Sequence, residues 1–108
     1  MEIINLELQE SNENRIINEF AKRLQISPLQ LIEQNKNRRI SDARQLYCKL
    51  RYDRHGLSYK ELGHELDRAH TTVRYGVLRI NNLLLNDKRI LTMWNMVKDI
   101  SELPGRGG

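Results

Sequence analysis

Apolar residues recur at helical spacing along most of the chain, which predicts an all-helical protein. The repeating positions define six segments, at about 15–24, 28–34, 42–55, 59–66, 70–86 and 88–100. The N-terminus departs from this pattern, because apolar residues alternate over 4–8 as in a strand before the turn-like stretch ESNEN. We therefore expect an acidic N-terminal arm over 1–14, a helical domain over 15–103 and a flexible tail over 104–108.

Residues typical of helix ends separate several of these segments. Ser27-Pro28 places a capping hydroxyl before a proline, whose missing N–H costs nothing at the first helical position. Ser58 and Glu61 have the spacing of a capping box, which predicts a helix start at this point. Gly56, just before them, is typical of the residue that follows a helix C-terminus.

Two further helix starts are predicted from polar residues alone. The basic stretch NKNRRIS at 35–41 is predicted to be a loop, with Ser41 or Asp42 capping the long helix that follows. Asn86 or Asp87 is predicted to cap the last helix of the chain.

The short helix over 59–66 and the longer one over 70–86 form a helix-turn-helix pattern. Gly63 falls where the two helices would cross, and any side chain there would push them apart. The stretch LDRAHTTVRYGV, at 66–77, contains the turn and the start of the second helix. That helix opens with His and Thr, which are mediocre helix formers. In this geometry the first turns of the second helix enter the DNA major groove. The residues at those positions are Ala69, His70, Thr71, Arg74 and Tyr75.

Positive charge is concentrated around this pattern. The formal net charge is +4, and 11 of the 18 Lys and Arg residues lie within 36–79, against five of the 14 acidic residues. Such a concentrated field favours a polyanionic partner, most often nucleic acid. Charge alone is equally compatible with a basic surface that is simply solvated.

Three sequence motifs resemble the C-terminal DNA-binding domain of the bacterial replication initiator DnaA. They are KNRRISDARQLY at 36–47, GLSYKELGHEL at 56–66 and RAHTTV at 68–73, in the order and near-spacing of that family. The resemblance extends over roughly 15–103. It implies an all-α fold, a compact multi-helix domain with a central helix-turn-helix of the Trp-repressor-like superfamily.

The resemblance also implies roles for individual residues. Arg68, His70, Thr71 and Thr72 fall at the positions that enter the major groove. Lys36 falls at the minor-groove position of the basic loop, with Arg38 and Arg39 beside it, and Arg44 falls at a phosphate-contacting position. The sequence departs from the family at Ala69, where the family has an acidic residue, and at Lys36, where it has arginine. The turn is also about one residue shorter.

Other candidate sites are less favoured by the sequence. The histidines and Cys48 lack metal-ligand spacing, so no metal site is expected. Cys48 lies on a predicted helix beside apolar residues, which favours a packed thiol over a nucleophile. Trp94 has the spacing of a core residue, with a partner-docking face as the alternative. Tyr52 and Tyr59 flank the basic region and are candidates for base stacking, although at least one is expected to pack against a neighbouring helix.

The sequence therefore predicts a DNA-binding protein without enzymatic activity and without a cofactor. Its expected partner is double-stranded DNA, with DnaA-box-like sites as candidates, and its expected role is that of a replication or transcription accessory or regulator. The sequence contains no GxxxxGK[ST] phosphate loop. The alternative is a protein-interaction module that docks on a replication or regulatory partner.

The remaining expectations concern context. No small-molecule substrate and no membrane association are expected. A monomer is the default, with a dimer as the alternative. The expected location is the cytoplasm, at the bacterial nucleoid or in a host cell if the chain is encoded by a phage or mobile element.

Overall fold

The computed structural model describes residues 12–34 and 37–102, which form six helices and no strand. The helices are α1 (Asn12–Leu24), α2 (Pro28–Ile32), α3 (Arg38–His55), α4 (Tyr59–Leu66), α5 (His70–Leu83) and α6 (Lys88–Val97). The predicted all-α fold class is therefore confirmed. Most of the predicted arm and the whole predicted tail lie outside the described residues, and α1 begins at Asn12 rather than at the predicted Arg15. No helix in the described part of the chain has the length and hydropathy needed to cross a bilayer.

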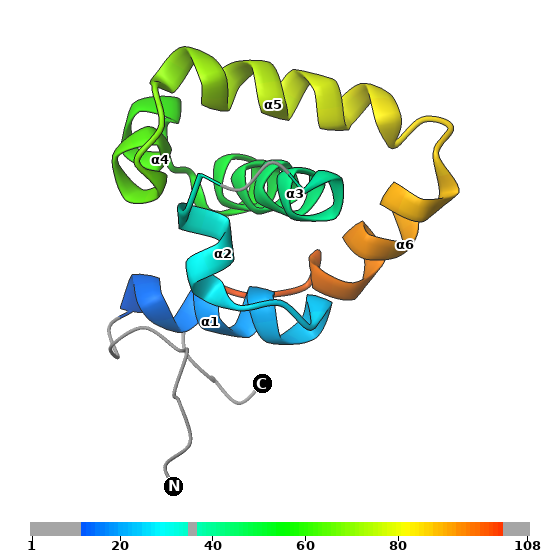
Figure 1. The fold of residues 1–108 in the computed structure, drawn as a ribbon, viewed down its shortest axis with the longest axis horizontal. Helices are drawn as coiled ribbons and strands as arrows, with labels where there is room; N and C mark the ends of the chain where they lie inside the picture. Colours follow the sequence, from blue (N-terminus) through cyan, green and yellow to red (C-terminus); the bar gives the residue numbers. More distant parts are fainter. Residues whose placement is uncertain (1–11, 35–36, 103–108) are drawn as a thin grey trace, which may run out of the picture.

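Helix α3 lies at the centre of the molecule and packs against the other five helices (Figure 1). In this view α5 runs across one side of α3 and α1 lies on the opposite side, while α4 lies to the left of α3 and α6 to its right. The short α2 connects the α1 side to α3 and also contacts α4. The helix-turn-helix formed by α4 and α5 is thus supported from beneath by α3.

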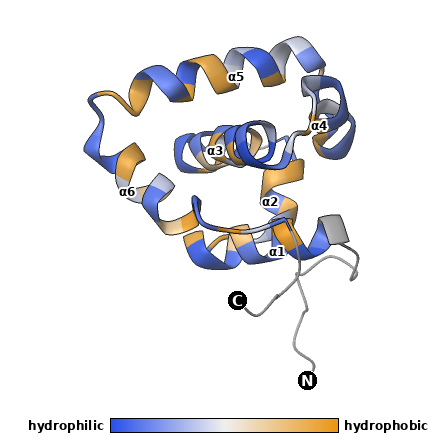
Figure 2. Cartoon of the chain, turned by 180° about the vertical axis from the view of Figure 1, so that it is seen from behind, coloured by the Kyte–Doolittle hydropathy of each residue, from blue (hydrophilic) through white to orange (hydrophobic). Residues whose placement is uncertain are grey.

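Hydrophobic and hydrophilic residues alternate along the helices (Figure 2), and the buried apolar residues of the described part of the chain form a single cluster. Phe20 of α1 meets Tyr47 of α3 edge to face, with ring centroids 5.2 Å apart. Trp94 of α6 is 9% exposed and belongs to the same cluster, which confirms its predicted core position. Burial of these apolar and aromatic side chains supplies the main driving force for holding α5 and α6 on α3.

Most of the predicted capping residues are confirmed, although α2, α5 and α6 end two to three residues before the predicted 34, 86 and 100. The Ser27 side chain accepts from the backbone N–H of Leu29, and Pro28 occupies the first position of α2. Gly56 ends α3 in the left-handed conformation, at φ 76°. At the start of α6, Asp87 accepts from two backbone N–H groups, so it is Asp87 rather than Asn86 that caps this helix.

The predicted start of α3 is wrong. The helix begins at Arg38, because the Asn37 side chain accepts from the backbone N–H groups of Arg39 and Ile40. The second half of the stretch predicted to be a loop is therefore helical. Asp42 is not a cap, and lies buried within the helix at 0% exposure.

Asp42 instead joins three helices. One carboxylate oxygen accepts from Nη1 of Arg79 in α5 at 2.9 Å, and the other accepts from Nη2 of Arg89 in α6 at 2.7 Å. Arg79 also donates to Oε1 of Gln45 at 2.8 Å. A buried charge requires such partners, so this cluster fixes α5 and α6 relative to α3.

Candidate DNA-binding site

The first helix of the helix-turn-helix begins at the predicted capping box. Oγ of Ser58 accepts from the backbone N–H of Glu61 at 3.0 Å, and Oε1 of Glu61 accepts from the backbone N–H of Ser58 at 2.8 Å. These two bonds satisfy N–H groups that have no partner within the helix. Helix α4 then ends at Leu66, and its C-cap residue, Asp67, adopts the left-handed conformation at φ 57° and ψ 50°.

Gly63 brings α4 into backbone contact with the turn. A Cβ atom at this position would collide with the carbonyl oxygen of Arg68 and lie 3.3 Å from the backbone nitrogen of His70. The same segment is closed by a hydrogen bond from the Arg68 N–H to the Gly63 carbonyl, at 2.8 Å. The predicted close crossing at Gly63 is therefore confirmed, and it fixes where α5 begins relative to α4.

Helix α5 presents a polar face to solvent at its N-terminal end. Its buried side consists of Val73, Gly76, Val77 and Ile80, which pack toward α3. Of the residues predicted to enter the major groove, Arg68 is half-buried. The others are exposed at this end of α5, and they are Ala69, His70, Thr71, Thr72, Arg74 and Tyr75. Ala69 is the N-cap of α5 and offers no side-chain hydrogen bond to the first turn. Uncapped N–H groups at a helix N-terminus are well suited to bind phosphate or a base edge.

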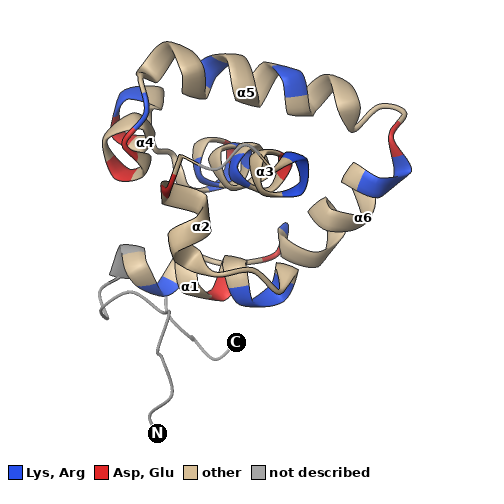
Figure 3. Ribbon diagram, in the orientation of Figure 1, with Lys and Arg blue, Asp and Glu red and all other residues tan. Residues whose placement is uncertain are grey.

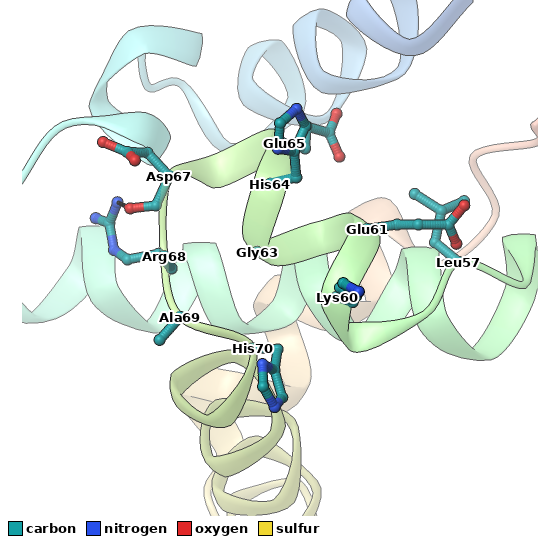
Figure 4. A pocket seen from close by; sticks show the side chains of 10 residues that line it. All are labelled: Leu57, Lys60, Glu61, Gly63, His64, Glu65, Asp67, Arg68, Ala69 and His70. Atoms are coloured by element: carbon teal, nitrogen blue, oxygen red, sulfur yellow. Dashed lines mark hydrogen bonds between the residues drawn. The ribbon is translucent and has the colours of Figure 1, made fainter.

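An open groove of about 970 Å³ lies between α4 and the start of α5 (Figure 4). Lys60 and His64 line it from α4, and Ala69 and His70 line it from the turn and α5. No role was predicted for Lys60 or His64. The signal that could have found them is position, because both lie on the exposed side of α4.

The sequence profile of a known family matches this part of the chain. The family is described as Bacterial dnaA protein helix-turn-helix, and the match covers residues 14–80. The chain belongs to this DnaA helix-turn-helix family. The family implies binding to double-stranded DNA, and the match spans α2, α3, α4 and nearly all of α1 and α5, ending before α6. A search of curated proteins gives no match.

The basic residues predicted near the helix-turn-helix differ in their exposure and hydrogen bonding. Arg38 is exposed in the first turn of α3, and Arg39 is exposed but donates from Nη2 to the carbonyl of Leu24 at 2.8 Å. Lys36 lies outside the described residues. Figure 3 shows the positions of the charged residues along the helices, including the two arginines of α5.

Arg44 and Arg68 are less exposed than the other residues predicted to contact DNA. Both side chains are half-buried, and their guanidinium groups donate to backbone carbonyls at the end of α2. Their predicted DNA contacts remain predictions, and in the structure these hydrogen bonds hold both side chains against the end of α2.

The other candidate sites pack into the fold. Cys48 is 3% exposed, and burial raises the pKa of its thiol to about 12, so the predicted packed thiol is confirmed. Tyr52 and Tyr59 stack on each other, with ring centroids 4.3 Å apart and planes 9° from parallel. Tyr59 also packs against the core, as predicted for at least one of the pair. Across the described residues, no group of three His, Cys, Asp or Glu side chains is arranged to hold a metal ion.

The left-handed residue in the DnaA-like turn leads to a stability prediction. Replacing Asp67 with glycine is expected to raise the free energy of unfolding by about 0.5–1 kcal/mol, because glycine adopts positive φ without a Cβ penalty. Chemical denaturation measures the change as a shift of the midpoint. The reciprocal control is Gly56→Ala at φ 76°, which should lower the midpoint. A lower midpoint for Asp67→Gly would mean that the aspartate side chain contributes more than its backbone conformation costs.

Proposed function

We propose that this DnaA-family chain binds duplex DNA with sequence preference by placing the first turns of α5 in the major groove. The observation that carries this proposal is the exposed, uncapped N-terminal end of α5. Arg74 has the fork geometry to bind guanine, and the threonines combine a methyl group with a hydroxyl. His70 and the free N–H groups of the first turn add donors for base edges or phosphates.

Basic side chains outside α5 are proposed to hold the phosphate backbone. Arg38 is exposed at the start of α3, and Lys60 faces the groove beside α5. Lys36 is proposed to reach the adjacent minor groove, as the family resemblance implies, with Arg39 beside it. These contacts position the protein on the duplex and contribute affinity that depends on salt.

The proposed biological role is that of a replication or transcription accessory or regulator that acts without its own ATPase activity. The proposed setting is the cytoplasm, at the nucleoid or in a host cell. Binding as a monomer to an asymmetric, DnaA-box-like site is the proposed mode, and a palindromic preferred site would instead indicate a dimer.

Fluorescence anisotropy tests the proposal with a duplex that carries a DnaA box, a scrambled duplex and a single strand. With about four to six phosphate contacts, the logarithm of the association constant should fall with the logarithm of salt concentration at a slope of roughly −4 to −5. Equal, salt-sensitive binding to both duplexes would indicate a different target site. Absence of duplex binding at low salt would overturn the proposal and favour the interaction-module alternative.

Variants of the exposed face separate base reading from phosphate contact. Arg74→Ala is expected to lower affinity for the preferred duplex by about 5- to 100-fold and affinity for the scrambled duplex much less. Arg38→Ala is expected to weaken both duplexes evenly and to reduce the salt slope by about one. Lys88→Ala, an exposed change on α6, is the control that should leave binding unchanged. Equal losses on both duplexes for Arg74→Ala would contradict the role given to Arg74.

A further inference from the structure

The carbonyl end of α2 is occupied by two arginine side chains from elsewhere in the chain. Arg44, from α3, donates from Nε to the Leu31 carbonyl at 2.7 Å. Its Nη2 lies 3.3 Å from the Gln30 carbonyl oxygen and 3.2 Å from that of Glu33. One guanidinium group therefore bridges two carbonyls of the five-residue helix α2 and the carbonyl of its C-cap residue, Glu33.

Arg68, from the helix-turn-helix turn, binds the same end of α2. Its Nη1 donates to the Ile32 carbonyl at 2.8 Å, and its Nη2 donates to the Glu33 carbonyl at 2.7 Å. Nη1 also donates to the Leu66 carbonyl at 2.7 Å, at the end of α4. Arg68 thereby links the last turn of α2 to the last residue of α4.

Two like charges are held close together in this arrangement. Desolvation by burial lowers the pKa of Arg44, and the positive charge of Arg68 lowers it further. The cost is offset because carbonyl groups at a helix C-terminus have no partner within the helix and accept hydrogen bonds from cations favourably. A guanidinium group held in this way has fewer donors left for a DNA phosphate than an exposed one has.

We propose that Arg44 and Arg68 are positioning residues for DNA binding and not DNA contacts. They fix the end of α2 to the turn, so that the start of α3, with Arg38, and the first turn of α5 meet one duplex in a set arrangement. This inference rests on the proposed function. Holding these two helix ends in place before DNA binds raises the affinity, because less conformational freedom is lost on association.

Lysine substitutions distinguish positioning from direct contact. Lysine keeps the positive charge and can still bind a phosphate, but it has no planar fork to bridge several carbonyls. Arg44→Lys and Arg68→Lys are each expected to weaken duplex binding by about tenfold, close to the loss in the corresponding alanine variants. The matched control is Arg38, where lysine should restore most of the affinity and the salt slope that alanine removes.

Hydrogen–deuterium exchange of the protein without DNA supplies the second readout. The two lysine variants should accelerate exchange of the α2 amides, including the Glu33 N–H that donates to the Leu29 carbonyl, whereas Arg38→Lys should not. Circular dichroism melting sets a temperature at which every variant is folded, so that binding losses are not caused by unfolding.

Two outcomes would overturn the inference: lysine variants that bind duplex DNA within about twofold of wild type, or α2 amides that exchange at the wild-type rate. Failure of the wild-type protein to bind any duplex would overturn the proposed function and the DNA-positioning role together. In that case faster exchange in the lysine variants would still identify the contact to α2 as structural, which separates the two failures.

Discussion

Replacing Gly63 with alanine is expected to lower the free energy of unfolding by about 2–3 kcal/mol, through overpacking that the local structure cannot relieve. The new Cβ would meet the carbonyl oxygen of Arg68 and the backbone nitrogen of His70, the latter at 3.3 Å. Both are main-chain atoms in the turn, so relief requires α5 to move away from α4. The loss outweighs the gain of about 1 kcal/mol that alanine normally brings over glycine within a helix.

Gly76→Ala is a matched control, because Gly76 is also buried and also lies within a helix. There the new Cβ would lie 2.8 Å from Cγ and 3.3 Å from Cδ of Gln45, a side chain that can shift at the cost of its hydrogen bond from Arg79, and the helix propensity of alanine offsets that cost. The free energy of unfolding should therefore change by less than about 1 kcal/mol.

Chemical denaturation measures both variants, and duplex binding gives a second comparison. Gly63→Ala should weaken duplex binding by more than about tenfold at a temperature where it is folded, because the start of α5 is displaced. Gly76→Ala should bind nearly as wild type. Similar midpoints for the two variants would show that the contact at Gly63 does not set the packing of α4 against α5.

The helix-turn-helix was predictable because its signals are local in the sequence. The capping box at Ser58 and Glu61, the left-handed Gly56 and the close contact at Gly63 all involve residues within a few positions of one another. The exposed face of α5 follows from the same helical periodicity. Whether that face reads bases stays a prediction, because exposure and residue type do not identify a DNA sequence.

The start of α3 was missed for a different reason. Arg38 and Arg39 resemble a basic loop when composition alone is considered, and Asp42 resembles a cap. Burial of Ile40, at 4% exposure, shows that the apolar stripe containing Ala43 continues one turn earlier than assumed. The spacing of Ile40 and Ala43 is thus the sequence signal for an earlier helix start, and the Asn37 cap sets the first residue.

The arginine contacts could not be read from local pattern at all. Arg68 and the Ile32 carbonyl are 36 positions apart, and Arg89 and Asp42 are 47 apart. Such pairs depend on how helices assemble, so a sequence motif does not distinguish an arginine that binds DNA from one that holds a carbonyl. The resemblance to DnaA assigned DNA contacts to Arg44 and Arg68, and only their hydrogen bonds to α2 raise the alternative.

Replacing Asp42 with asparagine is expected to lower the free energy of unfolding by about 3 kcal/mol, the lower part of the range for breaking a buried ion pair. The Asp42 side chain is 1% exposed, and each carboxylate oxygen binds a different arginine, at 2.9 and 2.7 Å. An asparagine amide offers only one oxygen, so its NH₂ group would face the second guanidinium group, donor against donor. The expected loss in the free energy of unfolding lies in the lower part of that range because the side chains of Arg79 and Arg89 are 29% and 46% exposed and can turn toward water.

Asp53→Asn provides the control on the same helix. Asp53 is 38% exposed and pairs with Lys49 at 2.7 Å, one helical turn away, so its loss should cost less than about 0.5 kcal/mol. Thermal or chemical denaturation compares the two variants directly, and equal midpoints would mean that the buried cluster contributes no more than a surface pair. A large loss at Asp42 would instead show that the buried cluster stabilises the fold, and Arg89→Met measures the share contributed by α6, which lies beyond the family match. Arg89→Met should then cost less than Asp42→Asn, because Asp42 would keep its hydrogen bond from Arg79 and leave only one of its two oxygens without a cation.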